Sequence, residues 1–213
     1  MTPELLYAEA EKLARSSYLL KATGSKSKLA AVWHASEEVE VDGEVYFHCL
    51  SVDTAWLPKK LNPGMGCLSL YLDEESYCLG IVRLEQGRRL EHFKAARALY
   101  AHQARSLPPL EAIMRFGSAR VEEWLDCIGS SRTDQYAPNT TEAQDYIQLW
   151  LKEHPLYQDD IFAVIGGWHF PWGYGDWGEL LEHELMFWTL EDAEPWFEVW
   201  QAQNEFQVLY RVT

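Results

Sequence analysis

The sequence predicts an α+β fold in which mainly antiparallel sheet, built from N- and C-terminal strands, accompanies a central group of about four helices. Three observations predict this class. Apolar residues alternate near both ends of the chain, they repeat every three to four positions in the middle, and no regular strand-helix-strand order connects the two patterns. A chain of 213 residues suffices for one compact core, so we expect a single α+β domain over residues 1–213.

The N-terminal part is expected to begin with a helix and continue in strands. Pro3 is suited to the first helical position, and apolar residues then repeat at helical spacing as far as Gly24. An apolar run at 29–33 has the length of a strand. Further along, the runs 67–72 and 77–84 flank a polar turn and predict a hairpin.

The clearest local signal is a second hairpin, centred on Asp42 and Gly43. This pair lies between the alternating runs 38–41 and 44–50, and Asp-Gly favours a two-residue turn because both central positions need positive φ. Pairing Val41 with Glu44 would place polar and apolar side chains together on one face: Glu38, Glu40, Val45, Phe47 and Cys49. Because this separation of polar and apolar residues is imperfect, we expect one strand of the hairpin to lie at a sheet edge.

The middle of the chain is expected to be helical. Helical periodicity covers residues 90–104, 110–116, 118–128 and 141–154. In the last of these helices, Thr141 and Gln144 form an expected capping box, and Pro155 ends the helix.

The C-terminal part returns to strands and carries most of the charge. Strands are expected at 161–165, 185–190, 196–201 and 206–212. Residues 141–213 hold 14 acidic and 2 basic side chains, against 19 and 16 in residues 1–140. The chain therefore divides by charge into a near-neutral lobe, 1–140, and an acidic, Trp-rich lobe, 141–213.

Composition excludes several classes of partner and location. A formal net charge of −15 disfavours nucleic acid, because binding to phosphates requires Lys and Arg. The first 20 residues lack the pattern of a secretory signal, and no apolar run approaches the ~20 residues of a membrane span. Four cysteines without a CxxC spacing predict reduced, mostly buried thiols. We therefore expect a cytoplasmic protein that binds no membrane.

The candidate binding site is the segment Gly166–Glu179. It combines five glycines and a proline with five aromatic residues, so it cannot form regular structure and yet carries large apolar rings. Such a loop either packs onto the sheet as a lid or binds a ligand. The binding interpretation takes seven residues of the loop: Trp168, His169, Trp172, Tyr174, Asp176, Trp177 and Glu179.

Signals for catalysis and for metals are weak. No nucleophile elbow and no phosphate-binding glycine motif is present. The spacing of His169, Asp176, Glu179 and His183 matches no established metal pattern. We therefore assign no catalytic residue, no metal ligand and no cofactor from the sequence.

These observations favour a non-enzymatic acidic protein that recognises a basic partner protein through the Trp-rich loop. Long-range attraction would speed the encounter and the rings would supply buried anchors, which is the charge logic of a small acidic protein that neutralises a cationic toxin or nuclease. One alternative is a hydrolase of carbohydrate or a similar polar ligand, in which two carboxylates act as acid and base. Another is a homodimer in which the loop is packing.

Overall fold

The computed structural model describes the chain in nine stretches: residues 2–24, 28–58, 66–73, 79–131, 138–153, 159–168, 183–190, 196–202 and 205–211. The chain forms two compact units, each assembled from three segments. Unit 1 comprises residues 1–16, 105–159 and 167–182, and unit 2 comprises residues 17–104, 160–166 and 183–213. Neither unit follows the division by charge at residue 140.

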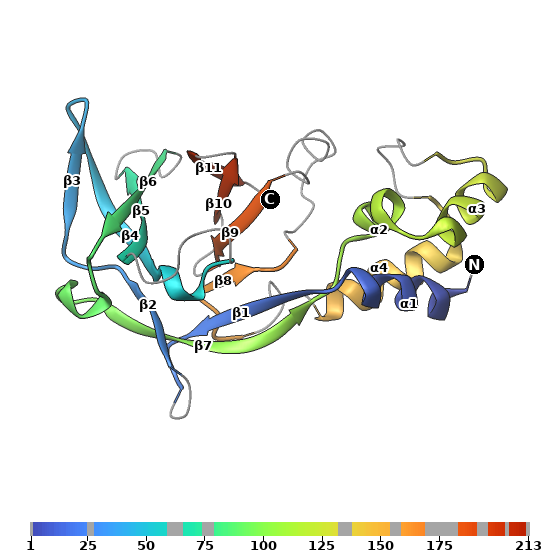
Figure 1. Ribbon diagram of the computed structural model, residues 1–213, viewed down its shortest axis with the longest axis horizontal. Coiled ribbons are helices and arrows are strands. Elements are labelled where there is room, and N and C mark those ends of the chain that lie inside the picture. The colour runs from blue at the N-terminus through green and yellow to red at the C-terminus, as the bar shows by residue number, and fades with distance from the viewer. Residues whose placement is uncertain are drawn as a thin grey trace. The chain divides into compact units, whose positions relative to one another are not determined.

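Unit 2 is built on one large antiparallel sheet (Figure 1). Within the described residues the sheet has eleven strands in the order β11-β10-β9-β8-β1-β7-β2-β4-β5-β6, with β3 paired to β4 beside this path. The strands are β1 (Arg15–Lys21), β2 (Leu29–Trp33), β3 (Glu38–Val41), β4 (Glu44–Asp53), β5 (Gly66–Asp73), β6 (Gly80–Gln86), β7 (Arg97–Ser106), β8 (Ala163–Gly166), β9 (Glu184–Thr189), β10 (Trp196–Ala202) and β11 (Glu205–Arg211). Two short 3-10 helices, η1 (Thr54–Trp56) and η2 (Leu90–His92), interrupt the loops.

The sheet curls until its two terminal strands, β6 and β11, are in contact, which makes it a nearly closed barrel. One point of contact is Gly80 of β6. A Cβ atom at this position would lie 3.0 Å from a methyl group of Val208 in β11. Glycine thus permits a close approach of the two strands, since a larger residue would require the Val208 side chain to shift.

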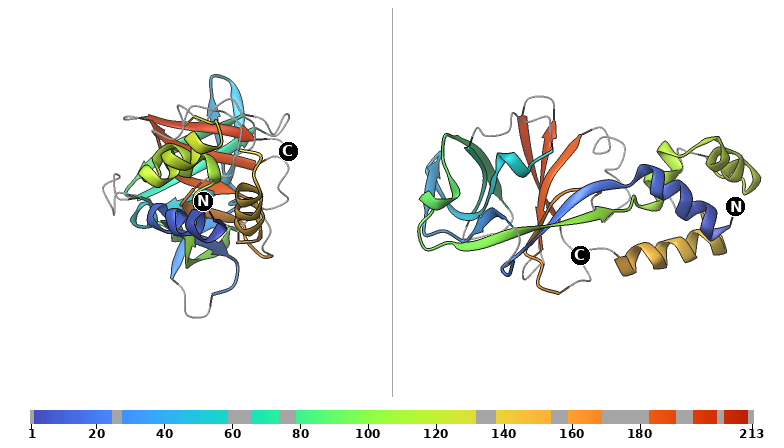
Figure 2. Two further views of the ribbon diagram at one scale, coloured as in Figure 1. Left: turned by 90° about the vertical axis from the view of Figure 1, so that its right-hand side faces the viewer. Right: turned by 60° about the horizontal axis from the view of Figure 1, so that its bottom comes forward.

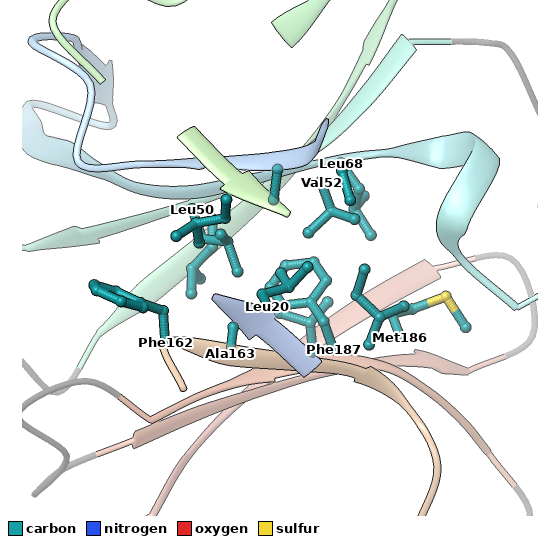
Figure 3. Close-up of a cluster of buried hydrophobic side chains, with 14 of the residues drawn as sticks. Leu20, Leu50, Val52, Leu68, Phe162, Ala163, Met186 and Phe187 are labelled. Atoms are coloured by element: carbon teal, nitrogen blue, oxygen red, sulfur yellow. The ribbon is translucent and has the colours of Figure 1, made fainter. Parts of the chain in front are cut away.

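The concave side of the sheet holds the main hydrophobic core (Figure 3). Leu50 and Val52 of β4 pair with Leu70 and Leu68 of β5, and all four are fully buried. Strands β1, β8 and β9 add apolar side chains to the same cluster, among them Leu20, Ala163 and Phe187. Each buried leucine or phenylalanine contributes about 1.5–3 kcal/mol relative to the exposed state, which is why these segments are strongly apolar.

Unit 1 is helical and has a core of its own. Within the described residues it contains α1 (Pro3–Leu13), α2 (Leu110–Phe116), α3 (Ala119–Cys127) and α4 (Thr141–Glu153), and α1 contacts both α2 and α4 (Figure 2). Tyr146 and Trp150 of α4 are buried and donate hydrogen bonds of 2.6 Å and 2.9 Å to the backbone oxygens of Pro108 and Leu107. These bonds satisfy the polar atoms of two large core side chains.

The predicted fold class was wrong. We expected an α+β fold in which mainly antiparallel sheet accompanies a central group of about four helices, whereas the described residues form mostly one large, nearly closed antiparallel sheet of eleven strands. The largest error concerns residues 90–104. Here Leu90 and Phe93 belong to a loop with one 3-10 turn, and from Arg97 onward the chain is β7, in which Leu99 and Ala101 face the core. Leu90 and Phe93 are spaced as in a helix, but this spacing occurs here in a loop.

A second error lies at the N-terminus. The helix expected to reach Gly24 ends at Leu13, and the chain continues directly as β1. The run Tyr18-Leu19-Leu20 is compatible with either structure by composition. This run forms a strand because it pairs with β8 in the sheet.

Several local predictions are confirmed. Val41 pairs with Glu44 across the Asp42-Gly43 turn, and β3 is the strand of this hairpin that lies beside the main path of the sheet. The expected hairpin β5–β6 also forms, and the strands expected at 196–201 and 206–212 are present and pair as β10–β11. Helix α4 is present, but its N-terminal cap differs from the expected one: the hydroxyl oxygen of Thr140, not of Thr141, accepts the hydrogen bond, from the N–H of Ala143.

No helix among the described residues is long and apolar enough to cross a bilayer.

Candidate functional site

The loop predicted as a binding site lies almost wholly outside the described residues. Of its seven candidate residues, the structure describes only Trp168. The other six, which keep the status of a prediction, are His169, Trp172, Tyr174, Asp176, Trp177 and Glu179.

Trp168 itself is a packed residue of unit 1. Its side chain is 3% exposed, and its indole N–H donates a 2.9 Å hydrogen bond to the backbone oxygen of Leu13. The guanidinium carbon of Arg15 lies 3.5 Å from the ring centroid, so a cation of the chain itself covers the ring face. The backbone N–H of Trp168 donates to the hydroxyl of Ser106 at 2.8 Å. In this position the ring anchors the start of the loop and offers no surface to a partner.

Trp188 and Trp200 of the acidic C-terminal part are both buried in unit 2. Trp188 of β9 lies opposite Glu198 of β10, and the indole N–H of Trp200 donates a 3.0 Å hydrogen bond to a carboxylate oxygen of Glu198. Glu198 is fully buried as well. Acidic and aromatic residues therefore do coincide here, but inside the molecule.

The hairpin β3–β4 presents an exposed acidic surface with apolar neighbours, and we call it the acidic hairpin (residues 38–47). Glu38 pairs with Phe47 and Glu40 with Val45, so these four side chains share one face. Val45 is 42% exposed and Phe47 is 38% exposed, and both glutamates are exposed as well. Asp42 and Glu44 at the turn add two more exposed carboxylates.

No positive charge from the same stretch of chain offsets these carboxylates, because residues 29–58 contain neither Lys nor Arg. The acidic hairpin stands at the margin of unit 2, with β3 outermost (Figure 1). It thus combines a concentrated negative charge, two exposed apolar side chains and the edge of a sheet.

A β-bulge at Cys49 separates the acidic hairpin from the core part of β4. The pairing of β4 with β5 shifts register between His48 and Leu50. As a result Phe47 and Leu50, although three residues apart, face the same side of the sheet, and His48 and Ser51 face the other. Strand β4 is therefore largely exposed at its first four residues and buried from His48 to Val52.

On this outer side of the sheet lies a buried chain of hydrogen bonds. His48 Nε2 lies 2.7 Å from the hydroxyl of Ser51, which lies 2.6 Å from the hydroxyl of Ser69, which donates to Glu85 Oε2 at 2.7 Å. The phenol of Tyr71 donates to the other carboxylate oxygen at 2.9 Å. We call these five residues, which come from β4, β5 and β6, the polar chain.

The direction of every hydrogen bond in the polar chain follows from its two ends. The N–H of Ala35 donates to His48 Nδ1 at 2.9 Å, so this nitrogen carries no proton and Nε2 carries one. At the other end Ser69 donates to Glu85, so Ser51 must donate to Ser69 and His48 to Ser51. In this tautomer His48 Nε2 already carries a proton and cannot accept the proton of Ser51. His48 and Ser51 are therefore as close as a nucleophilic Ser-His pair but cannot act as one.

The pKa of His48 agrees with this arrangement. Burial lowers it to about 4, while the negative charge of Glu85 opposes the shift and the positive charges of Arg88 and His34 add to it. His48 is therefore neutral at physiological pH and serves as a fixed hydrogen-bonding group.

The segment after β6 covers the polar chain and connects it to the acidic hairpin. Arg88 donates to Glu85 at 2.8 Å and forms an ion pair with Glu37, the residue before β3. Its guanidinium group also lies 3.8 Å above the ring of Phe93. The base of the hairpin is thereby held to the body of unit 2, which gives its exposed end a rigid support.

Beside Arg88 there is an open pocket of about 390 Å³ with a polar lining of mixed charge. It is lined by Leu29, Asp53, Gly66, Gly87, Arg88, Arg89, Leu90 and Glu91. Two carboxylates and two guanidinium groups balance each other in this lining. The pocket therefore has no preference of charge that would indicate a ligand class.

Sequence reasoning identified the shared face of Glu38, Glu40, Val45 and Phe47, but it missed the bulge at Cys49 and the polar chain. The available signal was the occurrence of Ser51 and Ser69 inside otherwise apolar strands, where each hydroxyl needs a partner. No group of three or more His, Cys, Asp and Glu side chains in the described part of the chain is arranged to hold a metal ion.

Comparison with known proteins adds no relative: no protein-family model, no curated protein and no solved structure matches this chain.

Proposed function

We propose that the protein is a non-enzymatic binding protein that recognises a basic partner protein through the acidic hairpin. The observation that carries this proposal is the shared face of Glu38, Glu40, Val45 and Phe47, on which exposed carboxylates and exposed apolar side chains lie side by side. Carboxylates supply attraction and selectivity for Lys and Arg, and apolar side chains supply the contact area that holds a complex together.

The charge of the whole chain supports the same partner. A net charge of −15 repels acidic surfaces and attracts basic ones over roughly a Debye length, about 8 Å at physiological salt. The acidic hairpin lies at an exposed edge of the sheet and adds its own carboxylates to the negative charge of the chain. The Trp-rich loop, as predicted from the sequence, would be a second contact surface for the same partner.

We also place the protein in the cytoplasm as part of this proposal. Cys67 and Cys127 are free thiols, and Cys127 is exposed. Free cysteines of this kind are typical of reducing compartments.

The proposal is tested by selecting displayed random peptides on the immobilised full-length chain at low salt. We expect the enriched peptides to be rich in Lys and Arg. Their affinity should fall about tenfold in the variant E38Q/E40Q, since two exposed ion pairs are worth up to about 1 kcal/mol each. Binding should also weaken as salt is added.

The matched control is E123Q/D126N, which removes two exposed carboxylates from α3 in unit 1 and changes the net charge by the same amount. This variant should leave peptide affinity within about twofold of the parent chain. Enrichment of peptides without basic residues, or equal losses in the two variants, would show that the hairpin is not the binding surface.

A further inference from the structure

We infer that the basic partner segment binds as an added β-strand along the open edge of β3, with Lys or Arg at alternate positions. This inference rests on the proposed function and names its partner more closely. A strand added to a sheet edge takes its affinity from backbone hydrogen bonds and its selectivity from alternate side chains.

The backbone of β3 is arranged to accept such a strand. The N–H of His48 donates to the backbone oxygen of Glu37, so residues 37 and 48 form a hydrogen-bonded pair. Hydrogen-bonded pairs alternate in antiparallel strands, and the register therefore directs the N–H and C=O groups of Val39 and Val41 toward β4. The same groups of Glu38 and Glu40 point away from β4.

This edge is open among the described strands. β3 pairs with β4 alone, whereas the terminal strands of the sheet, β6 and β11, contact each other. Glu38 and Glu40 together present two N–H and two C=O groups along the open edge. An extended partner segment of three residues suffices to form hydrogen bonds with the backbone groups of both Glu38 and Glu40.

The side chains of the edge determine what the added strand must carry. Residues of the partner directly opposite Glu38 and Glu40 would have their Cβ atoms about 5 Å from those of the glutamates, which favours opposite charge. Phe47 lies one strand further on the same face, about 10 Å from the added strand. An Arg side chain that leans across Glu38 covers most of this distance, and its guanidinium group then comes within the roughly 6 Å of the Phe47 ring that a cation-π contact requires.

The position between the two basic residues is expected to be apolar. Its side chain would lie on the opposite face of the sheet, next to Val39 and Val41, which are half-buried. The preferred partner segment is therefore basic-apolar-basic, in extended form.

A second copy of this chain does not fit the same edge. Pairing β3 with β3 would place glutamates opposite glutamates, which is unfavourable, and the stretch 29–58 has no basic residue to compensate. Acidic residues on an edge strand thus prevent self-association while permitting a basic strand to bind.

The test uses the basic peptide of highest affinity from the selection described above and replaces its backbone N–H groups by N-methyl one at a time. Strand addition predicts an alternating result. Methylation of residues whose N–H faces β3 should weaken binding by about tenfold or more, and methylation of the residues between them should change it by less than about twofold.

The protein side is tested with Glu40→Pro and its matched control Glu40→Gln. Both remove the same charge, but only proline removes the N–H that points to the open edge, and proline is tolerated at an edge strand because this N–H bonds nothing in β4. We expect E40P to bind the peptide about tenfold more weakly than E40Q, with an unchanged circular dichroism spectrum. If E40P does not fold, the methylation series decides alone.

The outcomes separate the two proposals. A peptide that loses affinity in E38Q/E40Q but binds equally in all N-methylated forms would overturn strand addition and leave the hairpin as the binding surface. Basic peptides that bind E38Q/E40Q as well as the parent chain would overturn the proposed function itself. Dimerisation of the chain that E40P abolishes would overturn the assignment of the edge to a basic partner.

Discussion

The neutral state of His48 makes a sharp prediction about stability and pH. In the native chain the pKa of His48 is lowered to about 4 by burial, whereas an unfolded chain has the ordinary histidine value of about 6.5. Between these two values the unfolded state binds a proton that the native state does not. The free energy of unfolding must therefore fall as the pH falls from about 6.5 to about 4.

The magnitude follows from the size of the shift. One pKa unit corresponds to about 1.4 kcal/mol, so the contribution of His48 is fully present above pH 6.5, has fallen by about 2 kcal/mol at pH 5 and by about 3 kcal/mol at pH 4. The upper part of this window is the more informative, because exposed carboxylates begin to titrate below about pH 5.

The assay is urea denaturation of the parent chain and of His48→Gln at pH 7, 6 and 5. Glutamine cannot titrate in this range and retains a donor for Ser51. We expect the parent chain to lose about 2 kcal/mol more than the variant between pH 7 and pH 5. Equal losses in the two proteins, or an NMR titration of His48 with a midpoint near 6.5, would refute the lowering of the His48 pKa by burial.

Three further predictions concern other parts of the structure. Gly80→Val should destabilise the chain by about 1–3 kcal/mol through its clash with Val208, and adding Val208→Ala should restore part of this loss, as measured by urea denaturation of the single and double variants. Trp168→Phe should cost about 1 kcal/mol because the backbone oxygen of Leu13, at the end of α1, loses its donor, and an unchanged melting temperature would contradict this. Iodoacetamide should modify Cys127 in the native chain and spare Cys67, which is buried and whose pKa is raised to about 12 by burial, as peptide mass spectrometry would show.

Local features of the structure could be predicted from the sequence because their causes are local. The Asp42-Gly43 pair has both its residues at positive φ, as its turn type requires, and this alone defines the register of the acidic hairpin. The mixture of glutamates with Val45 and Phe47 on one face likewise indicated an edge strand. Both elements of the proposed binding surface were thus present in the sequence before the fold was known.

The fold class and the role of buried residues depended on tertiary structure. Residues 97–106 have a spacing that permits a helix, and they form β7 because β2 supplies a strand to pair with. The polar chain unites positions from residue 48 to residue 85, which only the order β4-β5-β6 brings together. Trp168 is held by Leu13, Arg15 and Ser106, which no sequence pattern connects to it. Turn type and periodicity are encoded within a few neighbouring residues, whereas strand partners and burial are decided by free energies summed over the whole chain.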